Sequence, residues 1–180
     1  MPEDDGACDH LMGMDLPSIP LTSTSGETVD LSVLTGRTVV YCYPMTGRPD
    51  RELPKGWDDI PGARGCTPQS CGFRDRHAGI EGLGARIFGL STQDTAYQQE
   101  AVERLGLPFD LLSDEGLSFA RVLSLPTFES DGRTMINRLT LVADDGKIQK
   151  VFYPVFPPGE NADEVATWLS RNPRAERSEI

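Results

Sequence analysis

The sequence has few basic residues and no long apolar run. Seventeen Lys and Arg are set against 28 Asp and Glu, so the formal net charge is −11 at pH 7, which disfavours nucleic acids and anionic membranes as partners. No stretch approaches the ~20 apolar residues of a membrane-spanning helix. The first ten residues are acidic and lack Lys and Arg, unlike the basic start of a secretory signal. We expect a cytoplasmic protein without a membrane or nucleic-acid partner.

Cysteine is also sparse, too sparse for a disulfide scaffold. The chain has four cysteines, and in a cytosolic protein of this size such residues are more often catalytic, metal-binding or buried. Cys42 stands among apolar strand residues, which predicts packing, and Cys8 is predicted to be an exposed bystander. The pattern Cys8-Asp9-His10 and the wide spacing of the other two cysteines match a zinc site poorly. We therefore expect no metal and no cofactor.

At 180 residues, the chain suits one domain with one core. Residues 1–16 are acidic and aperiodic, which predicts a loosely held arm. Residues 17–172 then form the domain, and 173–180 a polar tail. The chain has no internal repeats.

Strand and helix patterns alternate along the domain. Two β-prone pieces within 17–31 predict an N-terminal hairpin, and Asp145-Gly146 predicts a second hairpin near the end. Between them the expected strands are 38–43, 85–91 and 109–112, and the expected helices are 67–77, 95–105 and 117–123. The second hairpin pairs 138–143 with 147–156. A last helix is expected over 161–171, with Asn161 as a candidate N-cap. This order predicts an α/β protein of thioredoxin-like outline, with a central mixed sheet flanked by helices.

The stretch from Met45 to Gly65 has no periodicity and is rich in Pro and Gly. Aperiodic loops of this length are uncommon in compact domains unless they are functional or disordered. Trp57 is apolar in this polar stretch, so it is either an anchor that packs the loop onto the domain or one wall of a substrate pocket. We adopt the second interpretation as a hypothesis.

Cys66 precedes a helix start in which Thr67 is the predicted N-cap and Pro68 the first helical residue. Unpaired backbone N–H groups and the positive end of the helix dipole stabilise an anion there, so Cys66 has the environment of a reactive thiolate. Cys71 lies five residues on, where a continuous helix separates the two Cα atoms by roughly 8–9 Å. A disulfide needs less than about 7 Å, so the first turns would have to unwind between Gly65 and Gly72. Without a disulfide, Cys71 is a buried helix residue.

Three stretches of the sequence together resemble one family. The segment 61–71 (PGARGCTPQSC) is similar to the Gly-Cys-Thr-x-x-x-Cys helix start of the bacterioferritin-comigratory, or Q-type, peroxiredoxins. The strand 39–44 (VVYCYP) resembles that family's strand ending in Tyr-Pro, and 137–148 (NRLTLVADDGKI) resembles its Arg-x-Thr strand and Asp-x-Gly-Lys-Ile hairpin. The similarity covers roughly residues 15–172.

The resemblance implies a thiol peroxidase that reduces hydrogen peroxide or organic hydroperoxides. Cys66 would be the peroxidatic cysteine, Cys71 the resolving cysteine, and Arg138 the guanidinium that holds thiolate and peroxide oxygen. A distance of about 4 Å or less between Arg138 and the Cys66 sulfur, the range of an ion pair, is the observation that would support this assignment most. Thioredoxin or a similar dithiol would be the reductant, and the chain would be a monomer or a homodimer.

The sequence also departs from the family pattern. The family has Thr or Ser three residues before the reactive cysteine and Pro four residues earlier, where this chain has Ala63 and Asp59. An insertion before Cys66 would explain this, with Pro44 and Thr46 supplying the ring and the hydroxyl from the near end of the loop. Alternatively, Thr46 is an ordinary turn residue. Gln69 stands where the family usually has Glu.

Two other classes of protein remain alternatives. A thioredoxin-like disulfide oxidoreductase or redox-sensing binding protein would use the same cysteines without peroxidase turnover, although such proteins usually carry Cys-x-x-Cys. A Cys–His hydrolase needs an imidazole beside the thiol. His77 lies eleven residues along the same predicted helix, roughly 16 Å from Cys66, and His10 stands in the acidic arm.

Overall fold

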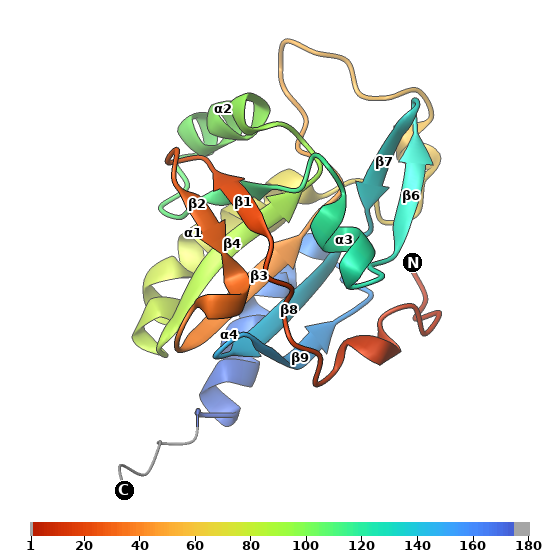
Figure 1. Cartoon of the computed structure of the whole chain (residues 1–180). Coiled ribbons are helices and arrows are strands. Elements are labelled where there is room, and N and C mark those ends of the chain that lie inside the picture. Colours follow the sequence, from red (N-terminus) through yellow and green to blue (C-terminus); the bar gives the residue numbers. More distant parts are fainter. Residues whose placement is uncertain (1, 175–180) are drawn as a thin grey trace, which may run out of the picture.

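The computed structural model describes residues 2–174, so most of the predicted polar tail lies outside the described residues. A mixed sheet has the strand order β2-β1-β5-β4-β3-β8-β9, and β6 and β7 form a separate hairpin (Figure 1). The strands are β1 (Pro20–Ser23), β2 (Thr28–Asp30), β3 (Arg37–Cys42), β4 (Ala85–Ser91), β5 (Leu111–Ser113), β6 (Thr127–Ser130), β7 (Arg133–Ile136), β8 (Leu139–Asp144) and β9 (Lys147–Phe152). The central mixed sheet and the N-terminal hairpin β1–β2 are as predicted.

Helices cover both faces of this sheet. They are α1 (Cys66–Gly82), α2 (Thr95–Leu105), α3 (Ser118–Val122) and α4 (Asn161–Arg171), with short 3-10 helices η1 (Asp9–Leu11), η2 (Leu31–Val33), η3 (Trp57–Asp59) and η4 (Pro158–Glu160). None of the helices within residues 2–174 combines the length and apolarity needed to cross a bilayer.

The central strand β3 divides the core into two clusters. All six of its residues are buried, as its continuous apolar run predicts. Because side chains alternate along a strand, Val39 and Tyr41 pack with α1, α2 and α4 on one face. Val40 and Cys42 pack with α3 and the N-terminal segment on the other. The predicted packing role of Cys42 is therefore confirmed.

The N-terminal segment is part of the second cluster. Leu11 is 0 % exposed and Leu16 is 3 % exposed, and both pack in that core. Cys8 is 5 % exposed, so the prediction that it is an exposed bystander is wrong. The boundary at residue 16 stays a prediction, but the described part of the arm holds buried side chains because apolar residues recur within its acidic sequence.

Several element boundaries differ from the sequence-based ones. The N-cap of α1 is Gly65 rather than Thr67, and α1 continues to Gly82. The N-cap of α4 is Glu160, so Asn161 lies inside the helix. The hairpin β6–β7 is absent from the sequence-based prediction. Its turn residues Asp131 and Gly132 both have positive φ, as a tight hairpin turn requires.

Burial of Leu11 supports a prediction about stability. Leu11→Ala should lower the free energy of unfolding by about 2–5 kcal/mol, because it removes a fully buried side chain and leaves a cavity. Met12→Ala is the matched control, since Met12 is 55 % exposed and its loss should cost no more than about 0.5 kcal/mol. Urea unfolding of both variants measures this. Equal small effects would show that the segment contributes nothing to the fold.

Candidate active site

Cys66 is the first residue of the long helix α1. It follows Gly65, whose φ of 112° no other residue adopts without strain, and no side chain caps the helix there. The first backbone N–H groups of α1 and the positive end of its dipole therefore lie beside the sulfur. The thiol is 3 % exposed. This is an environment suited to an anion.

Arg138, which lies 72 positions after Cys66 in the sequence, contacts this sulfur. It lies just before β8, is 5 % exposed, and its Nη2 donates to Cys66 Sγ at 3.1 Å. The same nitrogen lies 3.1–3.2 Å from the carbonyl oxygens of Gly62, Ala63 and Arg64. The structure thus brings together the two residues expected to meet, with the loop carbonyls fixing the guanidinium.

A chain of buried amides holds the other side of Arg138. Its Nη1 donates to Gln69 Oε1 at 2.6 Å, and Gln69 Nε2 donates to Asn161 Oδ1 at 3.0 Å. The hydroxyl of Thr140 donates to the same Asn161 oxygen at 2.7 Å. All these side chains are buried. They link α1, β8 and α4 behind the guanidinium, so its position is set from three elements.

Sequence reasoning missed this network. In the sequence, Gln69 is only a departure from the family pattern, and Asn161 is only a candidate N-cap. No local signal could reveal the contact, because the two residues are 92 positions apart. Gln69 carries both an acceptor for Arg138 and a donor for Asn161, whereas an ionised carboxylate offers acceptors only.

A cleft gives access to Arg138. Apolar walls come from Pro44 of the strand end, Pro61 of the loop and Phe128 of β6, and polar groups come from Asn137 and Arg138. The remaining lining residues are Pro2, Glu3, Asp5, Gly62, Tyr153, Pro154 and Val155. A small cleft that combines apolar walls with a buried guanidinium fits a compact group that presents an oxygen to Arg138.

Cys71 lies on the same helix as Cys66 but does not touch it. All four cysteines are free thiols, and Cys71 is only partly buried. Because α1 is continuous over both positions, their Cα atoms are about 8–9 Å apart, beyond disulfide range. A disulfide between them requires the first turns of α1 to open.

Pro44 and Thr46 are placed differently. Pro44 lines the cleft, so its ring lies beside the site. Thr46 is buried, and its hydroxyl donates to Gln93 Oε1 at 3.4 Å while its carbonyl accepts from the Tyr97 hydroxyl at 2.9 Å. These contacts direct Thr46 toward α2. They support the interpretation of Thr46 as an ordinary turn residue better than that of a catalytic hydroxyl. Its suggested catalytic hydroxyl stays untested.

Trp57 is not a pocket wall. It is 4 % exposed and packs in a small cluster with Met45, Ala63 and Met135. Its ring centroid lies 6.1 Å from that of Phe128. The hypothesis that Trp57 contacts substrate is therefore wrong: it anchors the loop, because a large apolar ring in a polar stretch is more stable when buried. Phe128, which it supports, lines the cleft instead.

The other cysteines lack the properties of a nucleophile. Burial raises the pKa of Cys8 to about 12 and also raises the pKa of Cys42. Both are protonated thiols near neutral pH, and a thiol reacts only as its thiolate.

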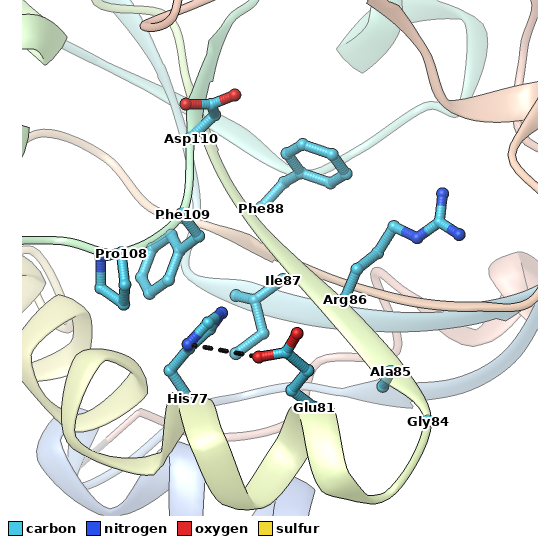
Figure 2. Close-up of a pocket in the computed structure, with 10 residues that line it drawn as sticks. All are labelled: His77, Glu81, Gly84, Ala85, Arg86, Ile87, Phe88, Pro108, Phe109 and Asp110. Atoms are coloured by element: carbon cyan, nitrogen blue, oxygen red, sulfur yellow. Dashed lines mark ion pairs between the residues drawn. The ribbon is translucent and has the colours of Figure 1, made fainter.

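Neither histidine lies beside Cys66. His10 Nε2 is 2.8 Å from the carbonyl oxygen of Leu123. His77 lies toward the far end of α1, in an open cleft with Glu81, Arg86 and Phe109 (Figure 2). Its Nδ1 is 3.9 Å from a Glu81 oxygen. The alternative of a Cys–His hydrolase is therefore not supported.

Known proteins resemble this chain over most of its length. Residues 11–168 match the Redoxin family. Peroxiredoxin Q, chloroplastic, is 33 % identical in Populus jackii (155 residues, 85 % of this chain, 65 % of that protein) and 32 % identical in Sedum lineare (155 residues, 85 % and 74 %). The chain spans just under two thirds of the length of the Populus protein and of its relatives in Oryza sativa. Peroxidoxin BcpB from Mycobacterium tuberculosis has a similar structure, with a TM-score of 0.70 at 25 % identity, covering 89 % of this chain and 96 % of that one.

A thioredoxin-like sheet with a cysteine at the start of its long helix defines a redoxin, and the chain belongs to the redoxin family. Within it, the chain belongs to the peroxiredoxins of the Q type. The predicted family and fold class are confirmed. The predicted insertion before Cys66 stays a prediction.

The positive φ of Gly65 supports a prediction about the start of α1. A Cβ at this position would lie 2.5 Å from Pro158 Cγ, so Gly65→Ala should destabilise the protein by at least about 1–2 kcal/mol. In the matched control Gly79→Ala, the added Cβ meets nothing within 4 Å and should stabilise the helix by about 0.5–1 kcal/mol. Chemical unfolding compares the two. Equal effects would contradict the close packing at Gly65.

Proposed function

We propose that the chain is a thiol-dependent peroxidase that reduces hydrogen peroxide or organic hydroperoxides. The single observation behind this proposal is the 3.1 Å contact between Arg138 Nη2 and Cys66 Sγ. It lies at the start of α1, and Arg138 also lines a cleft. The Cys66 thiolate attacks the terminal peroxide oxygen, the O–O bond breaks, and the alcohol or water leaves with a proton. Cys66 becomes a sulfenic acid.

Arg138 is suited to stabilise this step. Its Nε is buried and has no hydrogen-bond partner among the described residues, and the residue lines the cleft. Burial of an unpaired donor costs free energy, so an acceptor oxygen that reaches this N–H would be favoured. As the O–O bond breaks, negative charge grows on the leaving oxygen, and a fixed guanidinium stabilises that charge.

Cys71 then resolves the intermediate. Its thiol condenses with the sulfenic acid, a disulfide forms and water leaves. An external dithiol, thioredoxin or a similar protein, returns two electrons by thiol–disulfide exchange. A cytoplasmic location and a monomeric or homodimeric state remain part of this proposal.

The rival function is a disulfide oxidoreductase or redox-sensing binding protein. It would use Cys66 and Cys71 for exchange and leave peroxide intact. A coupled assay with a dithiol donor, which follows peroxide loss and donor oxidation together, separates the two functions. Donor oxidation without peroxide loss would support the rival.

The two cysteines should differ in their effects on turnover. Cys66→Ser should abolish peroxide consumption, because it removes the nucleophile. Cys71→Ser should allow one stoichiometric round and then over-oxidation of Cys66, seen by mass spectrometry. Cys8→Ala is the control and should retain turnover, since the Cys8 pKa of about 12 keeps that thiol protonated. Full multiple turnover by Cys71→Ser with the same donor would overturn the resolving role.

Replacement of Arg138 should slow the peroxide step. Arg138→Ala should lower the rate of Cys66 oxidation by about 10²–10³-fold, the usual loss for one preorganised electrostatic donor. Arg138→Lys keeps the charge but not the planar fork, so an intermediate rate is expected. Stopped-flow oxidation measures the rate, and circular dichroism checks folding. An unchanged rate in folded Arg138→Ala would place Arg138 outside the mechanism.

A further inference from the structure

The N-terminal segment lies at the mouth of the active-site cleft. Pro2, Glu3 and Asp5 line the same cleft as Arg138. In Figure 1 the chain starts near the β6–β7 hairpin and then runs past β9. The cleft therefore has a wall that comes from residues outside the family match, which begins at residue 11.

Specific contacts hold this wall in place. The Tyr153 hydroxyl donates to Asp5 Oδ1 at 2.9 Å, and the Ala7 N–H donates to the same oxygen at 3.0 Å. A few residues later, Cys8 and Leu11 are buried in the core. The segment is thus tied to the domain on both sides of Ala7, and the Asp5 carboxylate is fixed at the cleft.

These contacts also keep Asp5 charged. The backbone N–H of Ala7 and the Tyr153 hydroxyl lower the pKa of Asp5, and burial raises the pKa of Tyr153 to about 12. At neutral pH the tyrosine is a protonated donor and the aspartate an anion. Glu3 is exposed and adds a second acidic side chain to the same wall.

The charges inside the cleft do not offset these two acids. The hydrogen bonds of Arg138 go to backbone carbonyls, to the Gln69 amide and to the Cys66 sulfur. A thiolate at Cys66 balances the guanidinium, so the reacting pair is neutral. Glu3 and Asp5 then give the mouth a net negative charge, and clefts lined by charge of one sign repel ligands of that sign.

We propose that Glu3 and Asp5 form an acidic mouth that selects uncharged hydroperoxides over those that carry a carboxylate. The inference rests on the proposed peroxidase function and adds its specificity. The repulsion acts on approach to Cys66, so it lowers kcat/KM for the anionic substrate and leaves that for the neutral one almost unchanged.

Two substrates of nearly equal size test this inference. One is cumene hydroperoxide with a para-carboxylate, and the other is the methyl ester of the same compound. The ratio of their kcat/KM values, acid over ester, is measured for wild type and for Glu3→Gln/Asp5→Asn. Asn at position 5 keeps an oxygen for Tyr153 and Ala7, so the wall stays in place. The ratio should rise about three- to tenfold at low ionic strength, since one charge pair a few ångströms apart in water contributes about fivefold.

The chain offers a matched control in the same segment. Asp4→Asn/Asp9→Asn removes the same net charge, and neither residue lines this cleft. Its ratio should stay within about twofold of wild type. The rise in Glu3→Gln/Asp5→Asn should also fade in 1 M salt, where the Debye length is about 3 Å. An unchanged ratio in Glu3→Gln/Asp5→Asn, or an equal rise in the control, would overturn the acidic mouth.

A second measurement does not need peroxidase turnover. Iodoacetate and iodoacetamide are a charged and an uncharged reagent of similar size, and both alkylate a thiolate. Peptide mass spectrometry gives the rate of Cys66 alkylation by each reagent. The ratio of these rates, iodoacetate over iodoacetamide, should rise in Glu3→Gln/Asp5→Asn but not in Asp4→Asn/Asp9→Asn. A chain without peroxidase activity but with this rise would refute the proposed function and keep the acidic mouth. Without the rise, the acidic mouth fails.

Discussion

The buried guanidinium of Arg138 is the constraint on which the site depends. A buried cation is costly unless it is paired and fully hydrogen-bonded. Its partners are three consecutive loop carbonyls, the Gln69 amide and the Cys66 sulfur, and none of these is a carboxylate. The Cys66 sulfur is the one partner in this set that can carry a full negative charge. In the proposed function the guanidinium and the thiolate would stabilise each other, so a contact that supports the fold would also prepare Cys66 for reaction.

The proposed resolving step works against the same packing. Cys71 can reach Cys66 only when the start of α1 opens, yet a Cβ at Gly65 would meet Pro158, and one at Gly72 would lie 3.0 Å from the Gly159 oxygen. The helix start is thus packed closely against η4. The absence of a side-chain cap at Gly65 has the opposite effect, because a missing cap forgoes about 1 kcal/mol of helix stability. The first turn is thus packed closely against η4 but lacks a side-chain cap, which would suit the opening that the proposed resolving step requires.

Local patterns predicted the parts of the fold that local physics determines. The apolar run of β3, the hairpin turn at Asp145-Gly146 and the amphipathic α4 all lie where they were expected. The failures came from long-range contacts. Asn161 has the composition of a cap, but its side chain bonds Gln69 and Thr140 in the core. The buried Leu11 stands in a stretch whose acidity suggested a loose arm. In the site, Cys66 and Arg138 could be named by resemblance, whereas the cleft wall from the N-terminus could not, because it lies outside the family match.

Strand register explains how distant residues meet at one sulfur. The strands β3 and β8 are antiparallel, with Cys42 opposite Leu139, and one further step of that register places Arg138 opposite Tyr43. Pro44 therefore follows directly beside the guanidinium, and both line the cleft. A slip of one residue would send every side chain of β8 to the other face, which would remove Arg138 from Cys66 and Thr140 from Asn161 together. Leu139, Leu141 and Ala143 are buried in the cluster on the opposite face. Their burial fixes the register, so the apolar packing of one face of the sheet sets the position of the charge on the other.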